Sequence, residues 1–365
     1  MIYLDHAATS FPKLPTVKEA VDRALARCAN PGRGGHKPAM TAAETVFSCR
    51  ETAAEFCRCS PEQVVFTANC THGLNLAIHT LVRPGGRVLI SGFEHNAVTR
   101  PLHGLKAEPV VAGSVLFDPA NALEQFEAAL KRGVDAAVFA HVSNVFGYIL
   151  PVDEMAALCR KYRVPFAVDA AQSAGVLPVD FSGWGADFIA MPGHKGLLGP
   201  TGTGLLLCAR TPKPLLSGGT GSQSLEQEMP DFLPDGAEAG TLNVPGIAGL
   251  EAGIRHVKQS GLKTIAAREQ ALIKNCAAGL KALGFQVFSG PNQTGVLSFV
   301  PPMDCQQAAD LLASRGIAVR AGLHCAPLAH RTAGTLETGT VRISLGHSTK
   351  NHQIAYFLQN ARFLR

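Results

Sequence analysis

The stretch 191–202 contains the residues whose types point most directly to chemistry. Lys195 follows His194 there, after an apolar, strand-like run over 187–191 and before a glycine-rich turn. Proteins with α/β architecture place reacting groups at strand ends and in the loops that follow them. Because an amine held in such a place can form a Schiff base with an aldehyde, Lys195 is a candidate catalytic residue.

Asp169 ends a second apolar run, over 164–168. A carboxylate at the end of a buried strand is costly unless it has a partner. A protonated pyridine nitrogen would be such a partner, and Gln172 could then donate to an oxygen on the same ring. Taken alone, Asp169 is more simply explained as a helix N-cap.

Three further polar residues follow predicted strands. Thr71 lies between a strand and a helix, where backbone N–H groups and its hydroxyl could cradle a phosphate. His95 could stack on a planar cofactor and carry protons. Asn144 could bind substrate or shape a turn. A helix cap and a surface-loop histidine are the simpler alternatives for the first two, but the five sites together favour one active site.

Two features lie in the last third of the chain. Cys325 occupies a loop bounded by glycine and proline, next to a histidine and five residues after Arg320. Cationic neighbours and exposure favour a reactive thiolate, so Cys325 is the cysteine expected to be nucleophilic. Arg342 alternates with apolar residues in a predicted strand, and its planar fork suits a carboxylate unless it simply points to solvent.

The elements that must position these residues alternate in type. Strands are predicted at 63–67, 87–91, 136–142, 165–168, 188–191 and 204–208, with helices at 16–29, 39–56, 71–82, 121–131 and 152–162. This alternation predicts a mostly parallel, covered sheet. After an exposed loop at 217–240, two long helices (247–259 and 266–283) lead into strands at 296–300, 318–320 and 341–345 and helices at 306–314 and 351–363. This part is expected to form a smaller α+β domain.

Composition narrows the class of protein. The 365 residues are 46% hydrophobic and 17% charged, as in a globular protein, and the net charge of +5 forms no basic run that would favour nucleic acid. No CxxC pair occurs among the ten cysteines, so no metal site is expected. No signal peptide or membrane-length apolar run is evident, and a cytoplasmic location is expected.

Together these motifs resemble the cysteine desulfurase and selenocysteine lyase branch of the class V aminotransferases. The resemblance runs from Tyr3-Leu4-Asp5-His6 to the last strand, and its most specific motifs are Val168-Asp169-Ala170-Ala171-Gln172 and Gly193-His194-Lys195. It implies the fold type I of pyridoxal phosphate enzymes. That fold has a large domain (16–245) with a mostly parallel seven-stranded sheet covered by helices, and a smaller α+β domain (246–365) that carries the catalytic cysteine. Residues 1–15 would pack near the active site.

The resemblance also implies roles for the site residues. Lys195 would hold pyridoxal 5'-phosphate, Asp169 would pair with the pyridine nitrogen, and His95 would stack on the ring. The other implied cofactor-binding residues are Gln172 at the ring oxygen and Thr71, His72, His194 and Thr241 at the phosphate. Thr241 would come from the neighbouring subunit of a homodimer.

The implied substrate is L-cysteine or L-selenocysteine. Asn144, Arg342 and Arg320 would bind the substrate, and Cys325 would attack its sulfur or selenium. Release of alanine would leave a persulfide for an acceptor protein; another class V aminotransferase reaction is the alternative. The chain resembles the short-loop subgroup but has Pro192 where relatives often have serine, and it is shorter near 222–237.

Overall fold

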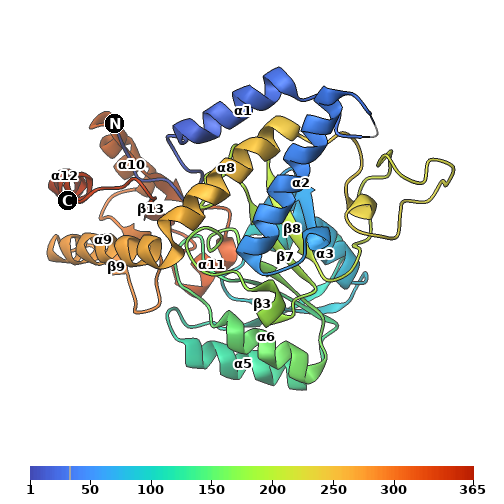
Figure 1. Ribbon diagram of the computed structural model, residues 1–365. Coiled ribbons are helices and arrows are strands. Elements are labelled where there is room, and N and C mark those ends of the chain that lie inside the picture. Colours follow the sequence, from blue (N-terminus) through green and yellow to red (C-terminus); the bar gives the residue numbers. More distant parts are fainter. Residues whose placement is uncertain (33) are drawn as a thin grey trace.

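The computed structural model describes residues 1–32 and 34–365 and is built around one large sheet (Figure 1). Its strands are β2 (Val64–Thr67), β3 (Arg87–Ser91), β4 (Glu108–Ala112), β5 (Ala136–Ala140), β6 (Phe166–Asp169), β7 (Phe188–Pro192) and β8 (Gly204–Cys208). They lie in the order β2-β8-β7-β6-β5-β3-β4. Only the two pairs that involve β8 are antiparallel, so the predicted mostly parallel, seven-stranded sheet is confirmed.

Both faces of this sheet are buried because alternate side chains enter different cores. Ile189 and Met191 of β7 pack with the helices on one face, whereas Phe188 and Ala190 pack with α3 and α4 on the other. The helices of this part are α1 (Pro15–Arg27), α2 (Lys37–Cys57), α3 (Cys70–Leu81), α4 (Asn96–Gly104), α5 (Pro119–Lys131), α6 (Val152–Tyr162), α7 (Phe181–Trp184) and α8 (Val244–Ser260). The first-named core includes residues of α2, α5, α6 and α8.

A second core follows at the left of Figure 1. Its strands form the antiparallel sheet β12-β13-β10-β9, and a short parallel pair joins β1 to β11. The elements are β1 (Ile2–Tyr3), α9 (Leu262–Ala282), β9 (Gln286–Phe288), β10 (Val296–Val300), α10 (Cys305–Ser314), β11 (Ile317–Ala318), β12 (Arg320–Gly322), α11 (Pro327–Thr332), β13 (Thr340–Ser344) and α12 (Asn351–Ala361). Three 3-10 turns lie at Pro61–Gln63, Asp235–Ala237 and Arg362–Leu364.

The structure refines several expected elements. The single strand expected at 318–320 is two strands in different sheets, β11 and β12, because the chain crosses from the N-terminal strand to the β13 edge there. The elements β4, α4, β9 and α11 were not predicted. The loop over 217–240 contains no helix or strand apart from one 3-10 turn, as expected. Helix α8 packs on α1 and α2, and the proposed domain limits at 245 and 246 fall inside it.

Candidate active site

Lys195 lies in the tight turn that follows β7, at the carboxyl end of the parallel strands. Two close approaches of backbone hold this turn. A Cβ added at Gly196 would come within 2.3 Å of the Ala174 carbonyl oxygen, and one at Gly253 would come within 2.2 Å of the Leu197 carbonyl oxygen. Glycine at these positions therefore lets the Lys195 turn pack directly against the β6 loop and helix α8.

A cavity of about 550 Å³ lies beside this turn. The predicted site residues that line it are Lys195, Asp169, Gln172, His95, Thr71, Asn144 and His194. Four other predicted residues, His72, Thr241, Arg320 and Arg342, and the predicted nucleophile Cys325 lie outside this lining.

Asp169 is 5% exposed at the end of β6. Its Oδ1 accepts a hydrogen bond of 2.8 Å from the Ala171 amide and one of 3.5 Å from the Cys70 thiol. No lysine or arginine pairs with it among the ion pairs of the described residues. A buried carboxylate of this kind is suited to a cationic group that enters the cavity.

The Lys195 amine is poised to be nucleophilic. Burial is the main cause that lowers its pKa, and the cations of Arg342 and Arg320 lower it further, whereas Asp169 raises it. A lowered pKa increases the fraction of neutral amine, which is the form that attacks a carbonyl carbon.

His95 is the N-cap of α4, and its Nδ1 accepts a hydrogen bond of 3.0 Å from the Ala97 amide. Burial lowers its pKa, which favours the neutral ring. Since Nδ1 accepts, the proton of a neutral ring resides on Nε2. His95 is thus held by α4 in one tautomer at the wall of the cavity.

The first turn of α3 forms another part of the wall. Asn69 caps this helix and accepts a hydrogen bond of 2.9 Å from the His72 amide. Thr71 lines the cavity, so its hydroxyl and the positive end of the helix suit an anion. The His72 side chain instead turns back, and its Nδ1 accepts a hydrogen bond from the Ala68 amide. It lines a neighbouring cavity with Thr241.

Arg342 is 2% exposed in β13 and does not point to solvent. It donates 2.7 Å to Asp5 Oδ1 and 3.0 Å to the Asn144 carbonyl oxygen. Asn144 in turn donates 2.8 Å to the His324 carbonyl oxygen and has a buried Oδ1 without a partner in the structure. The guanidinium and this free amide oxygen come from different parts of the fold and meet beside the cavity.

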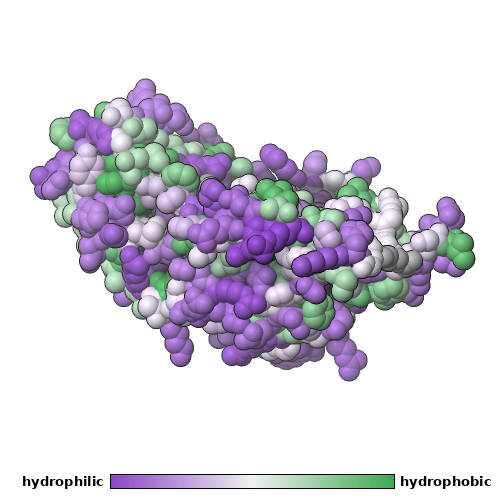
Figure 2. All heavy atoms as spheres, turned by 45° about the horizontal axis from the view of Figure 1, so that its top comes forward, coloured by the Kyte–Doolittle hydropathy of each residue, from purple (hydrophilic) through white to green (hydrophobic). Residues whose placement is uncertain are grey.

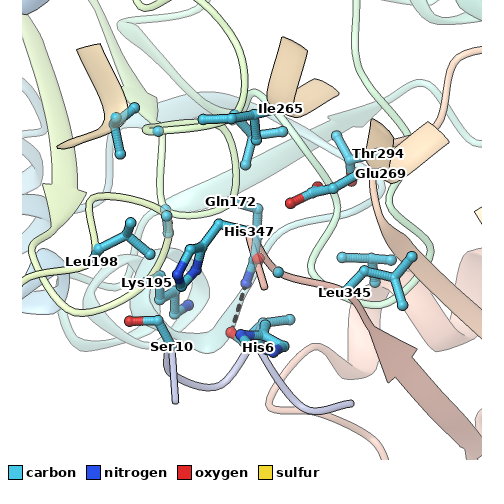
Figure 3. A pocket seen from close by; sticks show the side chains of 18 residues that line it. His6, Ser10, Gln172, Lys195, Leu198, Ile265, Glu269, Thr294, Leu345 and His347 are labelled. Atoms are coloured by element: carbon cyan, nitrogen blue, oxygen red, sulfur yellow. Dashed lines mark hydrogen bonds between the residues drawn. The ribbon is translucent and has the colours of Figure 1, made fainter. Parts of the chain in front are cut away.

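The N-terminal segment contributes His6, Ala7 and Ser10 to the lining of a second cavity of about 570 Å³, which Lys195 also lines (Figure 3). Gln172 lines both cavities and donates 3.0 Å to the Ala7 carbonyl oxygen. The His194 carbonyl oxygen accepts from Ser10 and from Lys13, at 3.0 Å each. These contacts hold Ala7 against the loop after β6 and Ser10 and Lys13 against the loop after β7.

Glu269 of α9 faces the same second cavity (Figure 3). It is 5% exposed, and burial raises its pKa to about 8. Asp5, Lys13 and Glu269 were not predicted as site residues. Asp5 does stand in the motif that carries the resemblance, but no spacing rule assigns it to Arg342.

Cys325 is the one exposed residue among the ten free cysteines. Its loop follows β12, and the Cys325 carbonyl oxygen accepts a hydrogen bond of 2.7 Å from the Asn96 amide, next to His95. His324 and Cys325 both have left-handed backbone conformations, with φ of 52° and 57°. The loop is therefore fastened to the cavity wall through its backbone while the thiol stays accessible.

Metal-binding clusters and membrane-spanning helices were also considered. Within residues 1–32 and 34–365, no group of three or more histidine, cysteine or acidic side chains is arranged to hold a metal ion. In the same residues no helix has the length and apolarity to cross a membrane.

Comparison with known proteins identifies the family. The model of the class-V aminotransferases matches residues 2–357. Probable cysteine desulfurases of Methanothermobacter thermautotrophicus and Pyrococcus abyssi are each 32% identical, over 97% and 98% of this chain and 92% of each relative. The apo structure of a cysteine desulfurase from Thermococcus onnurineus matches with a TM-score of 0.91 and 32% identity, over 100% of this chain and 94% of that one. The chain belongs to the class-V aminotransferase family.

Proposed function

We propose that this protein is a pyridoxal phosphate-dependent cysteine desulfurase that passes sulfur from L-cysteine to Cys325. The full-length similarity to proteins named cysteine desulfurases supports this activity. The observation that carries it is the position of Cys325, an exposed thiol whose loop is bonded to the residue after His95. Another class-V reaction would have no need of a nucleophile there.

The cavity residues fit pyridoxal 5'-phosphate. Asp169 is a buried carboxylate that could pair with a pyridinium, Lys195 is an amine of lowered pKa, and Thr71 lies at a helix N-terminus. His95 would lie over the ring, and the second N–H of Gln172 Nε2, whose first is bonded to the Ala7 carbonyl oxygen, would donate to the ring oxygen. The cofactor, when bound, condenses with amines and withdraws electrons from the carbon next to the amine.

The substrate carboxylate would be bound by Arg342 and by the second N–H of Asn144 Nδ2, whose first is bonded to the His324 carbonyl oxygen. Arg342 keeps an unpartnered, buried Nε, and its charge is held in place by Asp5. Arg320 pairs with Arg342 across β12 and β13 and adds positive charge at the same end. Lys195 would take the α-proton of the substrate, and His95 could hold a proton nearby.

Sulfur transfer then balances without an oxidant. The Cys325 thiolate attacks the substrate sulfur, an S–S bond forms, and the C–S bond breaks with its electron pair returning to the substrate carbon. A proton added to that carbon gives L-alanine. The net change is L-cysteine plus the Cys325 thiol to L-alanine plus the Cys325 persulfide, which an acceptor protein would then reduce or receive.

A homodimer would complete the phosphate site. Thr241 is exposed and lies outside the cavity of its own chain, in an open cavity of about 1540 Å³ with Phe47 and Arg50. The loop over 217–240 projects at the right of Figure 1, and a small hydrophobic group lies beside hydrophilic atoms at the right end of Figure 2. Phe47, Leu216 and Leu225 are 54%, 64% and 95% exposed, as expected of a surface that a second copy covers.

The ten free thiols support a reducing compartment such as the cytoplasm.

L-Selenocysteine has the same carboxylate and amine as L-cysteine, so the activity test must compare both substrates.

The test measures alanine release from L-cysteine and L-selenocysteine by the wild type and Cys325→Ala, with Cys28→Ala as a control for loss of a thiol. We expect Cys325→Ala to lose activity with L-cysteine while Cys28→Ala keeps it. Undiminished release from L-cysteine by Cys325→Ala would refute the proposal. A Cys325-independent release confined to L-selenocysteine would instead identify a selenocysteine lyase.

A further inference from the structure

Two buried histidines, one in the Cys325 loop and one in the helix that follows it, have no part in the chemistry described above. His324 is 5% exposed and His330, in α11, is fully buried. Their rings are nearly parallel, with His324 Nδ1 3.4 Å from His330 Nε2. At the far ends, His324 Nε2 lies 3.2 Å from the Arg320 carbonyl oxygen, and His330 Nδ1 lies 2.8 Å from Thr335 Oγ1.

The hydrogen bond to the Arg320 carbonyl oxygen fixes the position of each proton in this row of hydrogen bonds from Arg320 to Thr335. A carbonyl oxygen only accepts, so His324 Nε2 must donate to it. Neutral His324 then has an acceptor at Nδ1, and His330 Nε2 must donate to that atom. His330 Nδ1 is consequently an acceptor, and the Thr335 hydroxyl donates to it. Burial lowers the pKa of His324 to about 2 and that of His330 to about 4, so both rings are neutral at pH 7.

The histidine hydrogen bonds support the backbone at His324 and Cys325, which would not adopt its conformation without such contacts. His324 and Cys325 are consecutive left-handed residues, and neither is glycine. Such conformations persist only where the surrounding structure enforces them. One set of contacts that enforces them is the row of histidine hydrogen bonds. The other is two hydrogen bonds to backbone carbonyl oxygens, from Asn144 Nδ2 to that of His324 and from the Asn96 amide to that of Cys325.

We propose that Thr335, His330 and His324 form a positioning relay of hydrogen bonds that locks the Cys325 loop, so that the thiol is held toward the substrate cavity. The relay rests on the proposed desulfurase function for its purpose but not for its geometry. Both histidines act through Cys325 as positioning residues. The rigid hydroxyl-to-ring contact at Thr335 is the end of the relay that a substitution can remove with the least change of volume.

The direct test is ¹⁵N NMR of the holoenzyme labelled at histidine, with His324→Gln and His330→Gln used to assign the signals. We expect both rings to be neutral and to carry their proton on Nε2 at pH 7. An Nδ1–H tautomer at either ring, or a charged ring, would overturn the relay. This result does not depend on whether the enzyme releases sulfur, so it is distinct from a failure of the proposed function.

The functional test compares Thr335→Val, which removes only the hydroxyl, with Thr335→Ser, which keeps it. Thr335→Val is expected to lower kcat for alanine release from L-cysteine roughly tenfold, because small misplacements of reacting groups are costly. KM should change less than about twofold, and Thr335→Ser should retain the wild-type kcat. Wild-type kcat in Thr335→Val, or an equal loss in both variants, would contradict the proposal. Equal cofactor absorbance and melting temperature in the two variants exclude misfolding.

Discussion

The turn that carries Lys195 and the loop that carries Cys325 are held in different ways. Lys195 follows a central, fully buried strand, and glycines let the neighbouring backbone enclose it. Cys325 follows an edge strand of the smaller sheet, and its thiol is exposed while its backbone is fastened by side chains from other elements. An amine that must stay neutral gains from burial, whereas a thiol that must deliver sulfur needs access. The buried Lys195 turn therefore suits the proton-transfer chemistry, and the exposed Cys325 loop suits the transfer of sulfur to an acceptor.

The largest expected effect on activity comes from substitution of the buried Lys195. Lys195→Ala should abolish the visible absorbance of the cofactor-loaded protein. It should also lower alanine release by about 10²–10⁴-fold, the range typical of a positioned general base. Lys161→Ala, which removes an exposed amine paired with Glu127, serves as the control. Retention of the absorbance in purified Lys195→Ala would remove Lys195 from its role.

Asp5 connects the two regions, since its N-terminal segment contacts the Lys195 turn and its carboxylate holds Arg342. Asp5→Asn leaves a buried guanidinium without its counter-charge, so the free energy of unfolding should fall by about 3 kcal/mol. Asp22→Asn breaks the exposed pair with Lys18 and should change the free energy of unfolding far less than Asp5→Asn does. Denaturant unfolding measures both, and equal losses would show that the Asp5–Arg342 pair adds nothing.

Glu269 gives an effect that depends on pH. Its pKa is raised to about 8, so between its unfolded value of about 4.5 and pH 8 the native state binds more protons than the unfolded state. The wild type should therefore lose stability as pH rises through this window, by at most about 1.4 kcal/mol per pH unit from this group.

Glu269→Gln should remove that dependence, so its stability relative to the wild type rises from pH 4.5 to 8. Glu124→Gln, at an exposed position of α5, is the control and should follow the wild type. Parallel unfolding curves for Glu269→Gln and the wild type across this window would show that Glu269 is ionised in the native state.

The sequence predicted the large sheet and the residues at its strand ends because apolar periodicity locates both. Lys195, Asp169, His95 and Asn144 do line one cavity. Contacts between distant parts of the chain could not be predicted in this way. Asp5 and Arg342 are 337 residues apart, and their pairing depends on the bridge between residue 5 and Ser344. The edge strand β4 was missed because Glu108 and Pro109 interrupt its apolar pattern.

The central claim is that sulfur leaves the Lys195 cavity on Cys325. Its most direct test is a single turnover of the holoenzyme with L-cysteine, followed by alkylation and mass spectrometry of the cysteine-containing peptides. The account predicts a gain of one sulfur atom on the Cys325 peptide, in proportion to the alanine released. Alanine formed with the extra sulfur on another cysteine, or on none, would contradict it.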